Sequence, residues 1–431
     1  MSILFYKPPD YLSKSIVPIS TSQCDRYIER ASGSARAIPP GLSFEAIIEN
    51  KTLPPCSLSD FMDYLFYIEH SIENLQFYLW HRDYQRRWNM LSEKERSLSP
   101  QGQTTLPIPP AKKSQGHAAQ KPSVATTLFP LETEDAKTSP NEVSFDFPNP
   151  RNPDVSNQPF REECDFIVRK YILNDSPRQM NLSQRDRDIV LGGLQDTTHP
   201  SVFNPILRVA EATLRGQSHL NFVRWSICNG NKPRTIGVRT NAMFWTVVGL
   251  VAEIILILSR AARWWRILVA LLWLLSVTAV IVSFNGLCLL LYVGRAHEIR
   301  PWEVDDATSE RGRRFSADST VGAPTIRLAS KMAVYPASSQ SELGDGERSI
   351  KGGLTYINSI GYKESWEDST WEESYKRKPL ARKVVDKSVW IQEESLRKLQ
   401  DKIVLKAFIW CLIIIVPVTA GLTAIPKGNF F

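Results

Sequence analysis

The chain has 431 residues, of which 43% are apolar, and its formal net charge is +7. This length allows two to three domains, and the apolar content is sufficient for a hydrophobic core. The positive charge is small and mixed with acidic residues along the chain, which excludes a nucleic-acid footprint. Six scattered cysteines, without a C-x-x-C pair or histidines at metal spacing, predict neither a disulfide framework nor a metal site, and the soluble parts are expected in the cytosol.

Residues 1–40 are expected to form an irregular lead-in that packs partly on the domain that follows. They contain two proline clusters, and no apolar run among them is long enough for a secretory signal, so we expect this end of the chain in the cytosol. A short amphipathic helix is predicted over 42–48, and Pro54-Pro55 then interrupts the pattern.

Two amphipathic helices are predicted between Ser57 and Trp88. Ser57 and Asp60 form an N-cap box for the first, whose apolar face repeats at Leu58, Phe61, Leu65 and Ile68. The second opens on Glu73-Asn74 and carries its apolar residues at Ile72, Leu75, Tyr78 and Leu79. A carboxylate is favourable near the positive end of a helix dipole, so helix initiation alone is one interpretation of the Glu-Asn pair.

A second interpretation comes from the residues that follow the pair. The string E-N-L-Q-F-Y-L-W-H-R-D-Y, which ends at Tyr84, resembles the motif of regulator-of-G-protein-signalling (RGS) domains. In that motif Glu-Asn precedes a hydrophobic residue, a Phe, an aromatic residue and a later Tyr. The resemblance implies an all-α helical bundle in which Glu73 and Asn74 face the switch regions of a G-protein α subunit (Gα).

Residues 92–157 change character: Ser, Thr, Pro, Gln and Lys dominate, and no apolar period survives. This composition predicts a disordered insertion within the domain. Ser99 and Ser139 each precede a proline and are candidate phosphorylation sites, although such dipeptides are common in any proline-rich linker.

The helical pattern resumes at Phe160 and extends to Ile172, after which a loop ends on Ser183, a predicted N-cap with Asp186 three residues later. The RGS resemblance places Asn181, in this loop, against the Gα switch regions. Alternatively, Asn181 simply turns the chain before a helix.

A last soluble helix is predicted after Pro200, with Phe222 near its end. If Phe222 takes the place of the late aromatic residue of RGS domains, Ser218 falls on the Ser of the family and joins the Gα-binding set. Gln217 and Asn221, however, stand where active members carry an Asp and an Arg, so this ion-paired clamp is missing. The RGS-like domain is thus predicted over 41–228.

Three apolar segments are predicted to cross a membrane: 242–258, 267–293 and 407–425. Aromatic residues lie near their ends, as is typical of membrane interfaces. Glu253 is the exception within the first segment, and we expect it to reach the interface or to have a partner on another helix, with a transport role as the alternative. With the RGS-like domain in the cytosol, three spans place the largely disordered loop 296–404 there too.

Two features are predicted within that loop. Residues 388–402 have the pattern of an amphipathic helix leading into the membrane. Ser316 follows Arg313-Arg314-Phe315 and is a candidate for a basophilic kinase, although a solvated loop explains these residues equally well.

No catalytic constellation, phosphate-binding loop or cofactor motif is found, which predicts that the chain is not itself an enzyme. The expected function is membrane-anchored regulation of heterotrimeric G-protein signalling, in which the chain binds Gα and accelerates GTP hydrolysis without supplying a catalytic group. The order of an RGS-like domain followed by three spans resembles fungal membrane proteins of bud-site selection and cell polarity, which implies the plasma membrane or an endomembrane.

The alternative is a non-accelerating scaffold that docks a polarity-landmark membrane partner. The residues at Gln217 and Asn221 favour this alternative, whereas Glu73-Asn74 and Asn181 favour acceleration.

Overall fold

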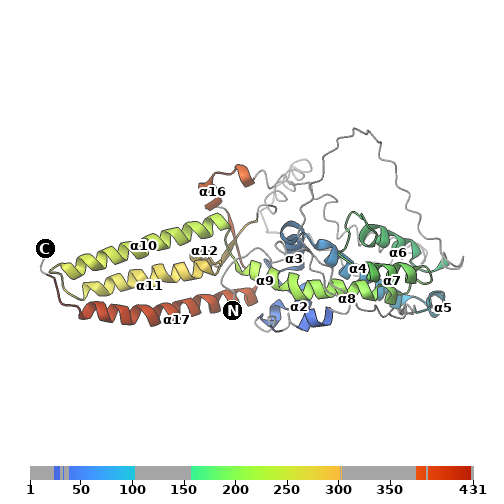
Figure 1. Ribbon diagram of the computed structural model, residues 1–431, viewed down its shortest axis with the longest axis horizontal. Helices are drawn as coiled ribbons and strands as arrows, with labels where there is room; N and C mark the ends of the chain where they lie inside the picture. The colour runs from blue at the N-terminus through green and yellow to red at the C-terminus, as the bar shows by residue number, and fades with distance from the viewer. Residues whose placement is uncertain are drawn as a thin grey trace, which may run out of the picture.

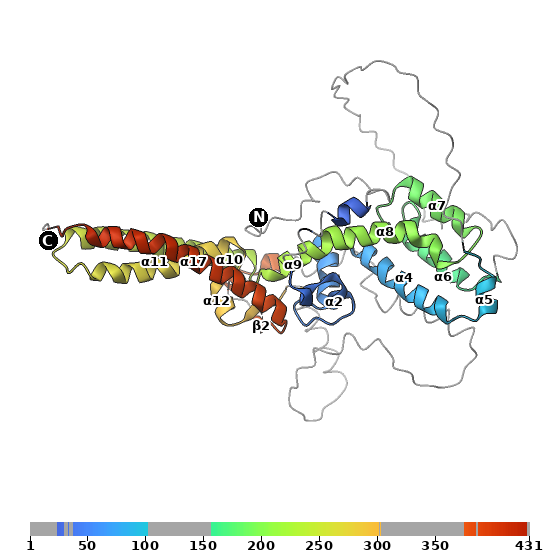
Figure 2. The same cartoon turned by 90° about the horizontal axis from the view of Figure 1, so that it is seen from below.

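The structure, a computed structural model, describes residues 24–29, 33, 38–101, 157–300, 302, 375–384 and 387–428. This part of the chain is mostly helical. A helical domain ends at Ile227, and three long helices then lie side by side in a rod that extends away from it (Figure 1). Figure 2 shows the same separation from a second direction.

The first half of the domain is built around one long helix. Its elements are η2 (Pro40–Leu42), α2 (Phe44–Ile48), α3 (Leu58–Tyr64), the π-helical turn η3 (Leu65–Glu69), α4 (Ile72–Met90) and α5 (Glu93–Ser97). The predicted N-cap box is confirmed: Ser57 Oγ accepts from the Asp60 amide at 3.2 Å, and the Asp60 carboxylate accepts from the Ser57 amide at 2.9 Å.

The predicted start of the insertion at residue 92 is wrong. Ser92 caps α5 with Glu95, and the residues that the structure describes continue without a break to residue 101. Ser99 is 1% exposed and its hydroxyl lies 2.9 Å from that of Thr198, so this candidate phosphorylation site is buried against the domain. Ser139 lies outside the described residues.

The second half of the domain begins at residue 157. It contains α6 (Arg161–Ile167), the π-helical turn η5 (Val168–Ile172), α7 (Gln184–Leu194), η6 (Pro200–Phe203), α8 (Asn204–Thr213), the π-helical turn η7 (Leu214–Ser218) and α9 (His219–Ile227). The predicted cap at Ser183 is confirmed, because its side chain accepts from the Asp186 amide at 3.1 Å.

Helix α4 is buried on two faces and thereby joins two apolar clusters. Phe77, Trp80, Tyr84 and Trp88 pack against the second half of the domain. Ile72, Leu75 and Leu79 pack against α2, α3 and Phe222. Phe222 also contacts Phe61, with the ring centroids 4.9 Å apart, so the end of the domain returns to its beginning.

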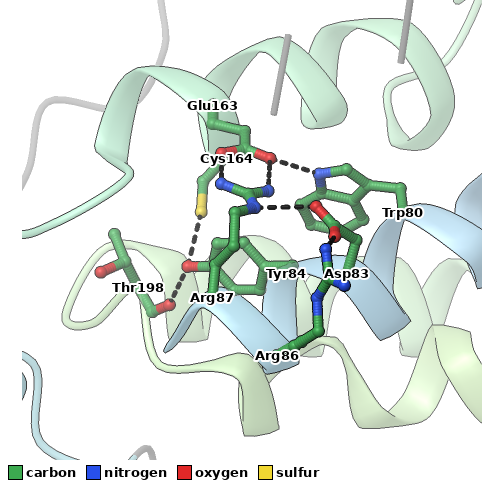
Figure 3. Close-up of polar contacts among 8 residues, drawn as sticks. All are labelled: Trp80, Asp83, Tyr84, Arg86, Arg87, Glu163, Cys164 and Thr198. Atoms are coloured by element: carbon green, nitrogen blue, oxygen red, sulfur yellow. Dashed lines mark hydrogen bonds and ion pairs between the residues drawn. The ribbon is translucent and has the colours of Figure 1, made fainter. Parts of the chain in front are cut away.

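A buried ion pair fastens α4 to α6 (Figure 3). The carboxylate of Glu163 has no exposed surface and accepts from the Trp80 indole at 2.7 Å and from both terminal nitrogens of Arg87 at 2.8 and 2.5 Å. Arg87 Nε also donates to Asp83 at 2.8 Å. Residues on either side of the 102–156 segment are therefore joined by charge-assisted hydrogen bonds, which are the stronger kind.

Three helices are long and apolar enough to cross a membrane: α10 (Lys232–Leu258), α11 (Trp265–Phe284) and α17 (Glu394–Ala424). The prediction of one apolar helix over 267–293 is wrong. Helix α11 ends at Phe284, and Gly286, at φ +80°, turns the chain into the short α12 (Leu289–Val293). Glycine tolerates this left-handed conformation because it has no Cβ.

A small sheet interrupts the expected all-α fold. Strands β1 (Ala296–Glu298) and β2 (Ser388–Trp390) pair antiparallel, with His297 opposite Val389. The helix predicted over 388–402 is therefore wrong at its start, and α17 begins at Glu394 and continues without a break into the third span. The described ends of the 296–404 loop are ordered, and α16 (Leu380–Val384) precedes β2. Ser316 lies outside the described residues.

The helical domain packs directly against α11 and α17. Leu42, Val223, Ile227, Ile391 and Leu396 belong to one apolar cluster that spans this junction. The Gln400 side chain donates to the Ile227 carbonyl at 3.0 Å, at the end of α9. Burial of apolar side chains from both parts fixes the orientation of the domain relative to the long helices.

At the other end of the rod, the expected partner of Glu253 lies on a neighbouring helix. Glu253 is 2% exposed and is electrostatically attracted to Arg266 of α11, although neither of its carboxylate oxygens forms a hydrogen bond within the described residues. Arg266 in turn donates to the carbonyls of Leu422 and Ile425 at 2.7 and 2.9 Å. A cation at this position is favourable because the last carbonyls of a helix carry partial negative charge.

Candidate functional site

Glu73 and Asn74 lie in the first turn of α4, directly after a sharp turn at His70 (φ +53°). The Asn74 side-chain amide donates to Glu73 Oε1 at 3.0 Å and to the Ser71 carbonyl at 3.4 Å. Asn74 is largely buried and Glu73 is partly exposed. The hydrogen bond between them thus holds the two side chains in place in the first turn of α4.

Asn181 is presented by a loop that its neighbours anchor. Met180 and Leu182 are buried in the core, whereas Asn181 between them is exposed. The Met180 amide donates to the Tyr171 carbonyl at 2.9 Å, which ties the loop to η5. Because the flanking side chains are buried, the Asn181 side chain is left at the surface of the loop.

Arg178 brings this loop to the start of α4. Its side chain is 7% exposed, and its guanidinium lies 5.8 Å from the centre of the Phe66 ring. It interacts electrostatically with Glu73 and with Tyr171. Burial raises the pKa of Glu73 to about 7, against the opposing effect of Arg178. The charge of Glu73 is therefore sensitive to anything that docks beside it.

Ser218 does not lie on the surface, contrary to its expected place on a Gα-facing surface. It has no exposed area, and its hydroxyl donates to Glu69 Oε1 at 2.6 Å. Burial also raises the pKa of Glu69 to about 7. Since Glu69 lies in η3, Ser218 joins η7 to the turn that precedes Glu73-Asn74, and its role is to position that turn.

Gln217 and Asn221 form no ion-paired clamp. The hydroxyl of Tyr27 donates to Gln217 Oε1 at 3.0 Å, so the short helix over 24–29 covers this position. A Cβ placed on Gly216 would lie 2.4 Å from the Tyr27 ring, which shows how closely this helix approaches η7. Asn221 is partly exposed one turn further on.

No role was predicted from the sequence for three residues of this site: Glu69, Arg178 and Tyr27. Glu69 follows Leu65 by four residues and thus lies on the apolar face of its helix, a signal that could have indicated burial. Arg178 and Tyr27 carry no comparable signal, because their contacts join segments far apart in the chain.

The candidate residues thus supply a carboxylate and two side-chain amides, groups that can recognise a polypeptide by hydrogen bonds. Comparisons with known protein families, with curated proteins and with solved structures find no significant match to this chain.

Proposed function

We propose that this chain is a membrane-anchored regulator of heterotrimeric G-protein signalling. Its RGS-like domain binds the switch regions of Gα through Glu73, Asn74 and Asn181. The observation that supports the proposal most is the position of Arg178, which lies just before Asn181 in the chain and contacts Phe66 in the turn that precedes the Glu73-Asn74 pair. Asn181 and the Glu73-Asn74 pair are separated by the whole 102–156 segment, yet they are the residues that the RGS resemblance pairs on one surface.

The proposed mechanism needs no catalytic group on this chain. Gα subunits carry their own arginine and glutamine for GTP hydrolysis, and acceleration follows when a partner holds the switch regions in their transition-state geometry. Only contacts that are stronger in the transition state raise the rate. The Asn74–Glu73 hydrogen bond and the Glu69–Ser218 contact beneath it pre-organise the docking surface and so lower the entropic cost of binding.

Membrane anchoring contributes by proximity. Helices α10, α11 and α17 hold the domain at the bilayer, where lipid-anchored Gα is also found, and this raises the effective concentration of the pair. Arg234 and Arg239 precede the first apolar stretch and favour the cytosol for the domain. The plasma membrane or an endomembrane is the proposed location, with a part in cell polarity.

The test is single-turnover GTP hydrolysis by candidate Gα subunits, with the full chain in lipid nanodiscs. The Glu73→Ala/Asn181→Ala double variant is expected to lose acceleration. The matched control is Glu93→Ala/Asn89→Ala, which removes the same two side-chain types from exposed positions at the far end of α4 and just beyond it. Equal loss in both variants, or no acceleration by the unchanged chain, would contradict the accelerator proposal.

A second candidate, a non-accelerating scaffold for a polarity-landmark membrane partner, is favoured by one observation. Gln217 accepts a hydrogen bond from Tyr27 at a position where active RGS domains carry a charged residue. Binding of the chain to the transition-state form of Gα without acceleration would support this scaffold. Absence of both binding and acceleration would show that Gα is not a partner of this chain.

A further inference from the structure

The residues that follow β1 return from the second long helix to the helical domain. The chain leaves α11 at Phe284, passes through α12 and β1, and reaches Arg300 and Trp302. The Ile299 amide donates to the Lys387 carbonyl at 3.0 Å, which adds one hydrogen bond to the pairing of β1 with β2. Arg300 and Trp302, called the strap residues below, are not among the residues proposed to bind Gα.

Trp302 is buried in a stack of aromatic rings, with 6% of its surface exposed. Its ring lies nearly parallel to that of Tyr67 in η3, at an interplanar angle of 18° and with the centroids 4.8 Å apart. It is also nearly parallel to the ring of Trp225 in α9, at 10° and 6.2 Å. Stacked aromatic pairs stabilise beyond the area that they bury. One strap residue therefore joins the last helix of the domain to the π-helical turn η3.

Arg300 attaches the strap to the start of the same helical segment. Its guanidinium lies 3.5 Å from the centre of the Trp225 ring, where a cation is favourable. It also forms an ion pair with Asp60 at 3.9 Å, and both side chains are largely buried. Asp60 belongs to the N-cap box of α3, and α3 continues directly into η3. The strap residues thus contact this segment at its beginning and near its end.

The rings of η3 continue the contact towards the Asn181 loop. Phe66 packs edge-on against Tyr67, with the ring centroids 4.8 Å apart and an interplanar angle of 88°. The Arg178 guanidinium lies 5.8 Å from the centre of the Phe66 ring. A continuous series of contacts therefore leads from Trp302 through two adjacent rings of η3 to Arg178.

The backbone of this turn is of a kind that depends on its surroundings. A π-helical turn is rare, and η3 ends at His70, whose φ of +53° is unfavourable for a residue with a Cβ. Such a conformation persists where the contacts around it over-determine it. Glu73 and Asn74 follow within four residues, so a change in η3 moves the start of α4 that carries them.

We propose that Arg300 and Trp302 are positioning residues for the Gα-binding surface, which act by holding η3 and thereby the turn before Glu73 and Asn74. Because the strap continues from the second long helix, the membrane-anchored part of the chain orients this turn. The consequence for Gα rests on the proposed function, whereas the ordering of η3 does not.

The test combines hydrogen exchange of the full chain in lipid nanodiscs with single-turnover GTP hydrolysis by Gα. Trp302→Ala is expected to increase exchange at residues 65–74 by about tenfold, since it removes two stacked pairs, while α6 to α8 change by less than about twofold. Acceleration of GTP hydrolysis is expected to fall severalfold. Trp302→Phe keeps a ring that can stack and should restore most of the protection and of the acceleration.

The matched control is Trp390→Ala, which removes an indole from β2 at the same junction. This ring is half exposed and contacts the Arg397 guanidinium, 4.9 Å from its centre, so its loss should change neither readout. Unchanged exchange at residues 65–74 in Trp302→Ala, or an equal increase in every helix of the domain in both Trp302 variants, would overturn the positioning role.

The two readouts separate this proposal from the proposed function. Increased exchange at residues 65–74 with undiminished acceleration would overturn the link between η3 and Gα. If the unchanged chain does not accelerate GTP hydrolysis but Trp302→Ala still increases exchange at these residues alone, the proposed function is contradicted and the positioning of η3 is supported.

Discussion

The Ser218 hydroxyl donates to Glu69 Oε1 at 2.6 Å and thereby joins two π-helical turns that are 149 residues apart in the chain. Both side chains are buried, and the contact lies beneath the first turn of α4. The residue that the RGS resemblance placed on the docking surface therefore acts from below, by fixing the turn that presents Glu73 and Asn74.

The burial of Glu69 predicts a stability that depends on pH. Burial raises the pKa of Glu69 from its ordinary 4.5 to about 7, so the folded domain keeps a proton that the unfolded chain loses. The stabilisation is complete below about pH 4.5 and is lost as the pH rises to about 7. We expect hydrogen exchange of the η3 and η7 amides, corrected for intrinsic rates, to report weaker protection at pH 7.5 than at pH 5.5. Glu69→Gln should flatten this dependence, and an unchanged slope would contradict it.

The Glu163–Arg87 pair predicts a large loss of stability on truncation. Glu163→Ala leaves the partly buried guanidinium of Arg87 and the Trp80 indole without their shared acceptor. We expect a cost of about 3 to 5 kcal/mol in the unfolding free energy of the domain. Arg86→Ala, which breaks an exposed pair with Asp83, should cost less than about 1 kcal/mol. Denaturant unfolding of the two variants, monitored by tryptophan fluorescence, measures this difference. Similar losses of unfolding free energy in both variants would show that the buried pair stabilises the domain no more than the exposed one.

Gly286 is predicted to be indispensable at the end of α11. Its φ of +80° disfavours any side chain, and a Cβ would lie 2.5 Å from the Cys228 sulfur. We expect Gly286→Ala to destabilise the junction by about 1 to 3 kcal/mol, seen as earlier aggregation on heating in detergent. Gly421→Ala in α17 is the control, because among the described residues no atom outside the helix's own backbone lies within 4 Å of its added Cβ. An equal effect of both substitutions would argue against strain at Gly286.

Tyr27 is predicted to shield the position of the missing clamp. Removing its ring by Tyr27→Ala deletes the hydrogen bond to Gln217 and the contact with Gly216. Hydrogen exchange at residues 216–218 should rise severalfold, and binding of Gα should strengthen if the proposed function is correct. Arg26→Ala changes an exposed residue of the same short helix and should have neither effect.

Local signals were sufficient to predict several elements of this fold. Ser57 with Asp60, and Ser183 with Asp186, marked helix starts that the structure confirms, because a side-chain cap satisfies amides within its own turn. Apolar length likewise indicated the three long helices, since crossing hydrocarbon requires about twenty apolar residues. The start of the insertion was predicted too early in the chain. Ser99 is buried against Thr198, which follows the 102–156 segment, and the residues near Ser99 do not reveal this contact.

By itself, the sequence determined the helical character, the three long apolar helices and the helix caps at Ser57 and Ser183. These depend on neighbours three or four residues away, whose chemistry can be read along the chain. Only the tertiary structure decided that Ser218 lies beneath the surface, that Tyr27 covers Gln217 and that an aromatic ring beyond β1 stacks on the helical domain. Each of these results from burial between segments distant in sequence, and the free energy of such burial depends on which surfaces meet.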